Sequence, residues 1–406
     1  MKILYFHQHF STPDGGTGTR SYEFSKALVS RGHEVTVICG SYDVGRTGLS
    51  HAFVKNRREG LVEGIKVIEY QAPYSNRLGL LKRAAQFLKF SLVCCKEVFK
   101  QKPELVFCTS TPLTIAIPGI FAKLFARKKF VFEVRDLWPE LPVAMGVIKN
   151  PLVIFALKLL EVVSYKLADH VIALSAGMAA GVSKHVEANK VSIISNGCDL
   201  HYVEQASQSI DLPDYLSPSD KVFIYSGTLG IANGLMALND AAEVLKKRKV
   251  ENIKILLAGD GMLRESLEAD AKARGLHNIF FLGNLPKKQV FSIYTRCTGG
   301  LMILDNIPAF YNGTSPNKFF DYLSAGLPII CNYPGWIEKQ LDETGAGIAV
   351  NPDDAEALAD ALIKVAMDEE RTAEMAEKAK ELAVSKFNRE DLICQFTQKI
   401  EEVGGR

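Results

Sequence analysis

The 406-residue sequence lacks the patterns that mark several common protein classes. Its eight cysteines form no C-x-x-C pair, so we expect reduced cytoplasmic thiols rather than a disulfide framework or a zinc site. No apolar run approaches the ~20 residues that span a bilayer, and residues 1–6 lead into polar His7-Gln8-His9, which indicates a strand rather than a signal peptide.

Familiar catalytic motifs are also absent. The sequence contains no H-E-x-x-H, P-loop or G-x-S-x-G motif, and no cluster of metal ligands. No pair of carboxylates indicates a glycosidase. The eight histidines are scattered, and we expect most of them to be structural or solvated.

Net charge is nearly absent overall, at +2, but its distribution is uneven. Residues 1–203 hold 26 Lys and Arg against 16 Asp and Glu, whereas the remainder holds 22 against 30. The length suggests two or three domains of ~150 residues each. A basic half joined to an acidic half indicates that only the first half faces an anionic partner.

Alternating strands and helices occur twice along the chain. Strands are predicted in the first half at residues 2–10, 34–39, 105–108, 130–134, 170–173 and 192–194. After a polar linker at 205–220, they recur at 222–225, 253–258, 279–282, 301–304, 329–331 and 348–350. This alternation predicts an α/β protein with two Rossmann-like, doubly wound parallel sheets, in domains 1–203 and 204–387 that face a cleft. Ligands of such sheets bind at the carboxyl ends of the strands.

Residues 315–332 predict a phosphate site. Ser315 is a favourable N-cap, Pro316 suits the first helical position, and Gly326 predicts the end of a short helix. The first turn exposes N–H groups and the positive end of the helix dipole, which attract phosphate. Lys318 lies in that turn and Asp321 follows one turn later, which suits a diphosphate and a ribose. The alternative is a capped core helix with one surface ion pair.

Glycine-rich turns follow three predicted strands. Residues 15–20 (Gly-Gly-Thr-Gly-Thr-Arg) allow close backbone approach to a phosphate or sugar. The second strand ends without a carboxylate, which argues against a nicotinamide-dependent dehydrogenase. Turns at residues 226–230 and 259–261 favour a nucleotide-binding floor in the second half. Purely structural corners between strand and helix are the alternative at all three places.

Two further segments carry charge. Residues 133–140 follow a buried strand with four ionisable side chains, so Arg135 and Asp136 are candidates for sugar contacts or proton transfer, unless this is a salt-bridged loop. Residues 80–102 predict a basic amphipathic helix. In it Lys82, Lys89 and Lys96 recur every seven residues, beside Arg83 and close to Phe87, Phe90 and Val93. This pattern suits a helix lying on anionic lipid, with a solvated outer helix as the alternative.

Taken together, these residues resemble the retaining nucleotide-sugar glycosyltransferases of family 4, which have the GT-B fold. The resemblance covers essentially the whole chain. It rests on the early G-G-x-G loop, N-G-C-D at 196–199, A-G-D-G at 258–261, F-L-G at 281–283 and D-Y-L-S-A-G-L-P at 321–328. The chain looks closest to the branch that assembles bacterial O-antigen or capsule repeats, as in lipopolysaccharide biosynthesis, on a polyprenyl diphosphate. That branch often transfers N-acetylated deoxy-amino sugars.

The resemblance implies a UDP-linked sugar donor held mainly by the second domain and a polyprenyl-diphosphate-linked acceptor held by the first. It implies no metal cofactor, no nucleic acid, a peripheral place on the inner face of the cytoplasmic membrane, and a C-terminal helix (388–406) that packs back on the first domain. We expect the donor to be bound by Gly16, Gly18, Gly227, Thr228, Leu282, Gly283, Asn317, Lys318 and Asp321. We expect Thr17 and Arg20 to bind the acceptor, Lys318, Arg135 and Asp136 to be catalytic, and Lys82, Arg83, Lys89 and Lys96 to contact the membrane.

The sequence departs from the family pattern at three positions. Asp321 occupies the place of the second Glu of the E-x7-E motif, but Gly313 occupies the place of the first. Residues 231–234 (Ile-Ala-Asn-Gly) replace the usual Arg and Lys, whose charge Lys318 would supply. Arg135-Asp136 stands where many members have His-Asp. A nucleotide-sugar 2-epimerase of the same fold and a non-catalytic sugar-nucleotide-binding subunit therefore remain alternatives.

Overall fold

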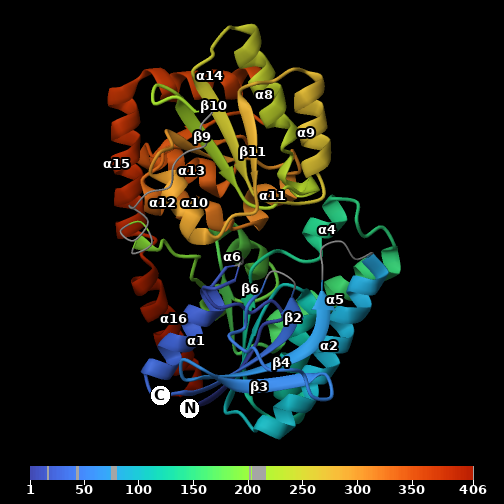
Figure 1. Ribbon diagram of the computed structural model, residues 1–406. Helices are drawn as coiled ribbons and strands as arrows, with labels where there is room; N and C mark the ends of the chain where they lie inside the picture. Colours follow the sequence, from blue (N-terminus) through green and yellow to red (C-terminus); the bar gives the residue numbers. More distant parts are fainter. Residues whose placement is uncertain (16–17, 43–44, 75–79, 201–202, 204–215, 406) are drawn as a thin grey trace. The chain divides into compact units, whose positions relative to one another are not determined.

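The computed structural model describes residues 1–15, 18–42, 45–74, 80–200, 203 and 216–405. The chain divides into two compact units (Figure 1). Unit 1 comprises Met1–Asn196, Asn312–Ser315 and Glu390–Arg406, and unit 2 comprises Gly197–Tyr311 and Pro316–Arg389.

Unit 1 is built on an eight-stranded sheet with the order β3-β4-β2-β1-β5-β6-β7-β8. Its strands are β1 (Lys2–Phe6), β2 (Glu34–Tyr42), β3 (Arg57–Val62), β4 (Ile65–Tyr74), β5 (Leu105–Thr109), β6 (Lys129–Val134), β7 (His170–Ala173) and β8 (Val191–Ile193). All neighbours are parallel except the hairpin β3–β4. The central strand β5 is buried along its whole length, as its continuous apolar run predicts for a sheet covered on both faces.

Helices cover both faces of this sheet. They are α1 (Arg20–Ser30), α2 (Leu80–Gln101), α3 (Ala116–Phe125), α4 (Glu140–Ala144), α5 (Pro151–Leu167), α6 (Ala176–Ser183) and α16 (Arg389–Gly404), with 3₁₀ turns at Leu113–Ile115 and Ala188–Lys190. One core lies beneath α1 and α16, which lie side by side, with Phe24 stacked on Phe396 at a centroid distance of 4.0 Å (Figure 1). The other core lies beneath α2, α3, α5 and α6.

Unit 2 is built on a six-stranded parallel sheet with the order β11-β10-β9-β12-β13-β14. Its strands are β9 (Lys221–Ser226), β10 (Ile253–Ala258), β11 (Ile279–Gly283), β12 (Gly299–Met302), β13 (Ile329–Cys331) and β14 (Gly347–Ala349). Its helices are α8 (Met236–Lys247), α9 (Arg264–Ala273), α10 (Lys287–Tyr294), α11 (Pro308–Gly313, which ends in unit 1), α12 (Asn317–Ala325), α13 (Trp336–Thr344), α14 (Ala355–Met367) and α15 (Glu369–Ser385), with a 3₁₀ turn at Ile231–Asn233. The predicted pair of parallel Rossmann-like sheets is confirmed.

The structure differs from the sequence predictions in the end of the first strand and in one hairpin. The first strand ends at Phe6 rather than residue 10, because the chain turns at His7-Gln8-His9. The hairpin β3–β4 was not predicted. Its two-residue turn holds Glu63 and Gly64 at positive φ (46° and 84°), the conformation that two-residue hairpin loops favour. Residues 205–215, most of the linker predicted at 205–220, lie outside the described residues.

Candidate active site

Backbone hydrogen bonds join the carboxyl ends of three neighbouring strands of unit 2. Gly227 N–H donates to Ala258 O at 2.9 Å, and Gly259 N–H donates to Gly283 O at 2.7 Å. Gly227 and Gly259 have φ values of 142° and 150°. A Cβ added at Gly259 would lie 1.8 Å from Gly227 O, so a side chain there would force the two turns apart. The glycines therefore allow an open backbone surface at the edge where ligands of parallel sheets bind.

The helix α12 begins beside this surface, one residue later than the sequence predicted. Pro316 is the N-cap in an extended conformation (ψ 131°), and no side chain of the described residues caps the helix. Ser315 is therefore not the cap; its Oγ donates instead to Leu174 O at 3.5 Å within unit 1. Gly326 ends the helix in the left-handed conformation (φ 67°), as predicted. The first-turn amides of α12 therefore have no capping side chain.

Lys318 extends from this first turn across the first glycine turn. Its Nζ lies 3.6 Å from the centroid of the Tyr225 ring, and a Cβ added at Gly227 would lie 3.3 Å from its Cε. Burial lowers the pKa of the Lys318 ammonium to about 7. Among the described residues, no carboxylate forms an ion pair with it. A half-buried cation that has an aromatic face beside it, and no acidic partner in the described part of the chain, would gain from a bound anion.

Asp321 lies one turn further along α12 and has a cationic neighbour. Lys287 Nζ from α10 lies 3.6 Å from Asp321 Oδ1, and both side chains are about one quarter exposed. The Asp321 carboxylate is therefore partly exposed and paired with one cation, so it can still accept a hydrogen bond from a ligand. Three other residues were predicted to bind the sugar donor. Thr228 and Asn317 are exposed, and Leu282, one residue before the end of β11, is half-buried.

A tyrosine network supports the turn beneath Lys318. Tyr322 Oη accepts from Ser226 N at 3.0 Å and donates to Ile224 O at 3.0 Å. Tyr294 Oη lies 2.5 Å from Ser226 Oγ. These buried hydroxyls fix the end of β9, immediately before Gly227. These tyrosines were not predicted from the sequence, because a Tyr within an apolar helix is typical of the core.

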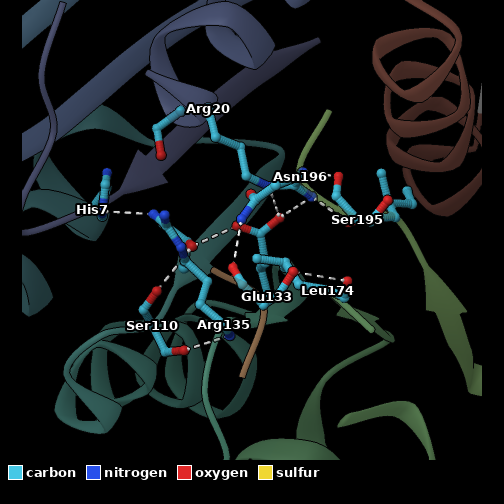
Figure 2. Close-up of polar contacts among 12 residues, drawn as sticks. His7, Arg20, Ser110, Glu133, Arg135, Leu174, Ser195 and Asn196 are labelled. Atoms are coloured by element: carbon cyan, nitrogen blue, oxygen red, sulfur yellow. Dashed lines mark hydrogen bonds and ion pairs between the residues drawn. The ribbon is translucent and has the colours of Figure 1, made fainter. Parts of the chain in front are cut away.

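In unit 1, polar side chains gather at the carboxyl ends of β1, β5 and β6 (Figure 2). Arg135 Nη1 lies 3.3 Å from His7 Nε2, and Arg135 N donates to Ser110 Oγ at 2.9 Å. Burial and the neighbouring Arg135 hold the pKa of His7 well below its usual range, so His7 is the neutral acceptor. Next to His7, the Gln8 side chain is buried, and neither end of its amide has a hydrogen-bond partner among the residues that the structure describes. Such a group needs a partner, and a ligand hydroxyl would supply one.

Asp136 follows Arg135 at the same strand end. Thr111 Oγ1 donates to its Oδ2 at 3.5 Å. Burial raises the pKa of Asp136 to about 6, although Arg135 and Thr111 both oppose the change. A carboxyl group with this pKa accepts or donates a proton near neutral pH. His7 and Gln8 were missed by the sequence analysis; the signal that could have found them is the polar H-Q-H run directly after a buried strand.

The structure corrects the role predicted for Arg20. Its guanidinium is buried and donates to Glu133 Oε2 through Nε and Nη2, at 3.0 and 2.8 Å. It also donates to Ser195 O at 2.5 Å and to Ile194 O at 2.7 Å (Figure 2). Thr109 Oγ1 donates to the same carboxylate, at 2.6 Å to Oε1. Arg20 thus uses its donors inside unit 1, and we no longer expect it to contact the acceptor.

The remaining positions of the early glycine loop are only partly described. Gly16 and Thr17 lie outside the described residues. Gly18 is exposed directly before α1, whose N-cap, Thr19, makes no capping hydrogen bond through its side chain. Gly313, in the place of the first Glu of the family motif, is buried in unit 1. A Cβ there would lie 3.3 Å from Leu141 Cδ2 and 3.9 Å from Leu137, so any side chain at this position requires the Leu141 side chain to shift by a few tenths of an ångström.

The predicted lysines of the basic helix α2 are exposed, but two of the apolar side chains beside them are buried. Lys82, Lys89 and Lys96 are exposed, and Arg83 is half-buried. Phe87 and Phe90 are buried against unit 1, so these two cannot reach a lipid surface. In the described part of the chain, no helix combines the length and hydropathy that crossing a membrane requires. The same part contains no group of three or more His, Cys, Asp or Glu placed to hold a metal ion, and all eight cysteines are free thiols.

Comparison with known families accounts for most of the sequence. Residues 14–202 match the model described as Glycosyltransferase Family 4, and residues 213–382 match Glycosyl transferases group 1. The chain belongs to glycosyltransferase family 4. The resemblance inferred from the sequence motifs is confirmed at this level, as is the GT-B fold.

Relatives of this family 4 glycosyltransferase are distant in sequence. WcaI of Escherichia coli K12, named as a glycosyl transferase of colanic acid biosynthesis, is 24% identical, and the match covers 98% of this chain and 100% of WcaI. Sucrose-phosphate synthase from Thermosynechococcus elongatus superposes with a TM-score of 0.74 at 18% identity, covering 100% of this chain and 99% of that one. Anabaena HepE in complex with UDP-glucose gives 0.70 at 17% identity, covering 99% and 100%.

Proposed function

We propose that this enzyme transfers a sugar, with retention of configuration, from a UDP-linked donor to a saccharide carried on polyprenyl diphosphate. The observation that carries the proposal is Lys318, a half-buried cation without an acidic partner among the described residues, at the start of α12 and beside the glycine turns. A nucleotide diphosphate supplies the anion that this arrangement requires. The UDP-glucose complex of HepE and the name of WcaI support the donor class and a role in surface polysaccharide synthesis.

The donor would be held by unit 2. The glycine turns after β9 and β10 allow the diphosphate to approach the backbone, and the first-turn amides of α12, at Asn317 and Lys318, point their dipoles toward it. Asp321 would accept hydrogen bonds from the ribose hydroxyls. As the bond to the sugar breaks, negative charge grows on the diphosphate, and Lys318 with the helix dipole stabilises it. Gly283 and Leu282 would border the base at the end of β11.

The acceptor would be held by unit 1. Gln8 and Arg135 supply hydrogen-bond donors at one strand end, and the basic composition of this half suits a diphosphate-linked lipid. In a same-face mechanism the donor phosphate takes the proton of the acceptor hydroxyl. Asp136 is then a contact to a sugar hydroxyl rather than the main base. The exposed lysines of α2 would meet anionic lipid.

The pH dependence of kcat/KM should show both unusual ionisations. Activity should rise through about pH 6 as Asp136 loses its proton, and should fall above about pH 7 as Lys318 loses its own. A bound diphosphate raises the pKa of Lys318, so the alkaline limb of the kcat profile should lie at higher pH than that of kcat/KM. Steady-state kinetics of the wild type and Asp136→Asn tests this, because the variant should lose the acidic limb. An unchanged acidic limb in the variant would assign that ionisation to another group.

Asp321→Ala should weaken binding of the nucleotide diphosphate about ten- to hundredfold. Hydrogen bonds to a charged acceptor contribute ~1.5–3 kcal/mol, and the ribose hydroxyls would lose theirs. Calorimetric titration with UDP measures the change. The matched control is Lys287→Gln, which breaks the same ion pair but keeps the carboxylate. Equal losses in both variants would show that the ion pair matters rather than the carboxylate; unchanged affinity in Asp321→Ala would remove this residue from the site.

A screen of nucleotide diphosphates by thermal shift tests the donor class directly. A ligand that binds the folded state alone, at ~100 times its dissociation constant, stabilises it by about 2.7 kcal/mol. We expect UDP to raise the unfolding temperature more than the other nucleotide diphosphates, and Asp321→Ala to reduce the shift. A larger shift with another base would replace UDP in the proposal. The absence of a shift with every diphosphate would contradict a nucleotide-sugar donor.

A further inference from the structure

Nine large apolar side chains are exposed on three helices of unit 1. They make up more than half of the seventeen such side chains found in the described part of the chain. They are therefore clustered, whereas exposed apolar side chains usually occur singly over a protein surface. Their exposed fractions run from 45 to 77%. The apolar face is defined by Leu88, Leu92 and Phe99 of α2, Leu124 and Phe125 of α3, and Leu152, Val153, Phe155 and Leu159 of α5.

The three helices form one continuous surface. The helix α3 packs against both α2 and α5, and the Phe99 ring of α2 meets Phe121 of α3 edge-on at 5.3 Å. All three contribute buried side chains, such as Cys94, Ala122 and Tyr165, to the same core beneath the sheet. Their exposed side chains therefore lie on the side of the helix layer that faces away from the sheet.

The outward side of α5 carries apolar side chains, whereas the outward side of a helix in water normally carries polar ones. Leu152, Phe155 and Leu159 are three and four residues apart, so they share one side of the helix. Only Ser164 and Tyr165 of its seventeen residues are fully buried. An outer helix of a sheet in water places polar residues where α5 places these three. Burial against unit 1 does not explain this apolar stripe.

The exposed charged side chains carried by α2, α3 and α5 themselves are all positive, whereas Glu104 and Glu140 are exposed carboxylates on neighbouring segments. Within α2, α3 and α5 the carboxylates are Glu97, which is buried and bonded to Tyr70 and Gln101, and Glu161, which is half-buried. The exposed cations on these helices and directly beside them are Lys82, Lys89, Lys96, Lys100, Lys102, Arg127, Lys129, Lys149, Lys158 and Lys166. An apolar centre surrounded by lysine and arginine matches the cross-section of an anionic lipid surface.

The geometry points to α5 as a helix that inserts into the acyl boundary of an anionic bilayer, with the apolar side chains of α2 and α3 beside it and the lysines at headgroup depth. A second copy of this chain is a poorer occupant, because a symmetric contact would bring two lysine-rich surfaces together. This inference extends the proposed lipid-linked acceptor by naming the surface that reaches the lipid. It is testable without donor or acceptor.

Sedimentation with vesicles tests insertion separately from electrostatic adsorption. The apolar variant changes Leu152, Phe155 and Leu159 to Ser, and the charge variant changes Lys82, Lys89 and Lys96 to Gln. On vesicles of phosphatidylglycerol and phosphatidylcholine, the apolar variant should lose at least about 100-fold in partitioning, and the loss should persist at high salt. The charge variant should lose about 100-fold at low salt and little at high salt.

Matched controls come from exposed positions of unit 2. Met367→Ser with Val384→Ser, both 54% exposed in the wild type, should leave partitioning unchanged. A Trp at position 155 (Phe155→Trp) should shift its emission to the blue on vesicles, whereas Met367→Trp should not. Equal partitioning of the apolar variant and wild type, or no blue shift at position 155, would overturn the inference. Self-association of the wild type without lipid, abolished in the apolar variant, would instead assign the face to a second copy.

Failure of this inference and failure of the proposed function give different results. If the enzyme is a glycosyltransferase and α5 inserts, the apolar variant should keep its activity on a short water-soluble acceptor and lose it on vesicle-bound acceptor. If α5 does not insert, both activities should equal those of wild type. If neither wild type nor variant transfers sugar while partitioning still differs, the proposed reaction is wrong and the lipid surface stands.

Discussion

Lys318→Ala should lower the turnover number about 100- to 1,000-fold while raising the donor KM by less than about tenfold. The reason lies in the surroundings of Lys318: it has an aromatic face and a glycine turn beside it and no acidic partner among the described residues. Charge on the leaving diphosphate grows in the transition state, and an interaction that strengthens there accelerates the chemical step. Steady-state kinetics at saturating donor measures the effect.

Lys339→Ala is the matched control for Lys318, because it removes an exposed lysine of α13 from the same unit. It should leave turnover unchanged. EDTA should also leave wild-type turnover unchanged if Lys318 and the α12 dipole carry the stabilisation, whereas a loss restored by magnesium or manganese would assign it to a metal ion. A Lys318→Ala enzyme with normal turnover and only a weaker donor KM would reduce Lys318 to a group that binds the ground state.

Glu133→Gln should destabilise unit 1 by about 3–5 kcal/mol, the range measured when one partner of a buried ion pair is removed. The variant leaves the guanidinium of Arg20 buried without a counter-charge. Scanning calorimetry should show a transition lowered by ~2–4 °C for each kcal/mol in a unit of this size. Lys26→Gln is the control, because its pair with Glu63 is about half exposed and should contribute less than about 1 kcal/mol.

The double variant Arg20→Met with Glu133→Leu distinguishes the loss of the ion pair from the cost of leaving one buried charge without its partner. Replacing both charges by apolar groups removes the unpaired charge, so the double variant should be more stable than Glu133→Gln. If instead the double variant loses as much as the two single changes added together, the two side chains stabilise unit 1 through independent contacts. The network matters for function as well, since Glu133 lies one residue before the end of β6, the strand that presents Arg135 and Asp136.

The fold was predictable from sequence because its signals are local. Short apolar runs that alternate with helical segments predicted most of the strands of both sheets, and Gly326 predicted the end of α12. The hairpin β3–β4 was missed because its exposed strand β3 alternates few apolar residues, and its turn is Glu-Gly rather than Asn-Gly or Asp-Gly.

The site was less predictable because its contacts are distant in the chain. Arg20 and Glu133 are 113 residues apart, so an arginine in a glycine-rich loop read as a ligand contact although it pairs internally. The apolar sequence from Leu152 to Leu159 is typical of a buried core helix, and only the structure shows that several of these side chains are exposed. Ser315 was a favourable N-cap by composition, but the extended conformation of Pro316 starts the helix one residue later.

Mass analysis of the sugar nucleotide, incubated with the enzyme alone and with a polyprenyl-diphosphate-linked saccharide, tests the central claim most directly. We expect the acceptor to gain the mass of one sugar residue while UDP is released, and the donor alone to stay unchanged. An isomerised donor in the absence of acceptor would indicate a 2-epimerase. A donor that binds but stays intact in the presence of every acceptor would indicate a non-catalytic subunit, and either result would contradict the transferase proposed here.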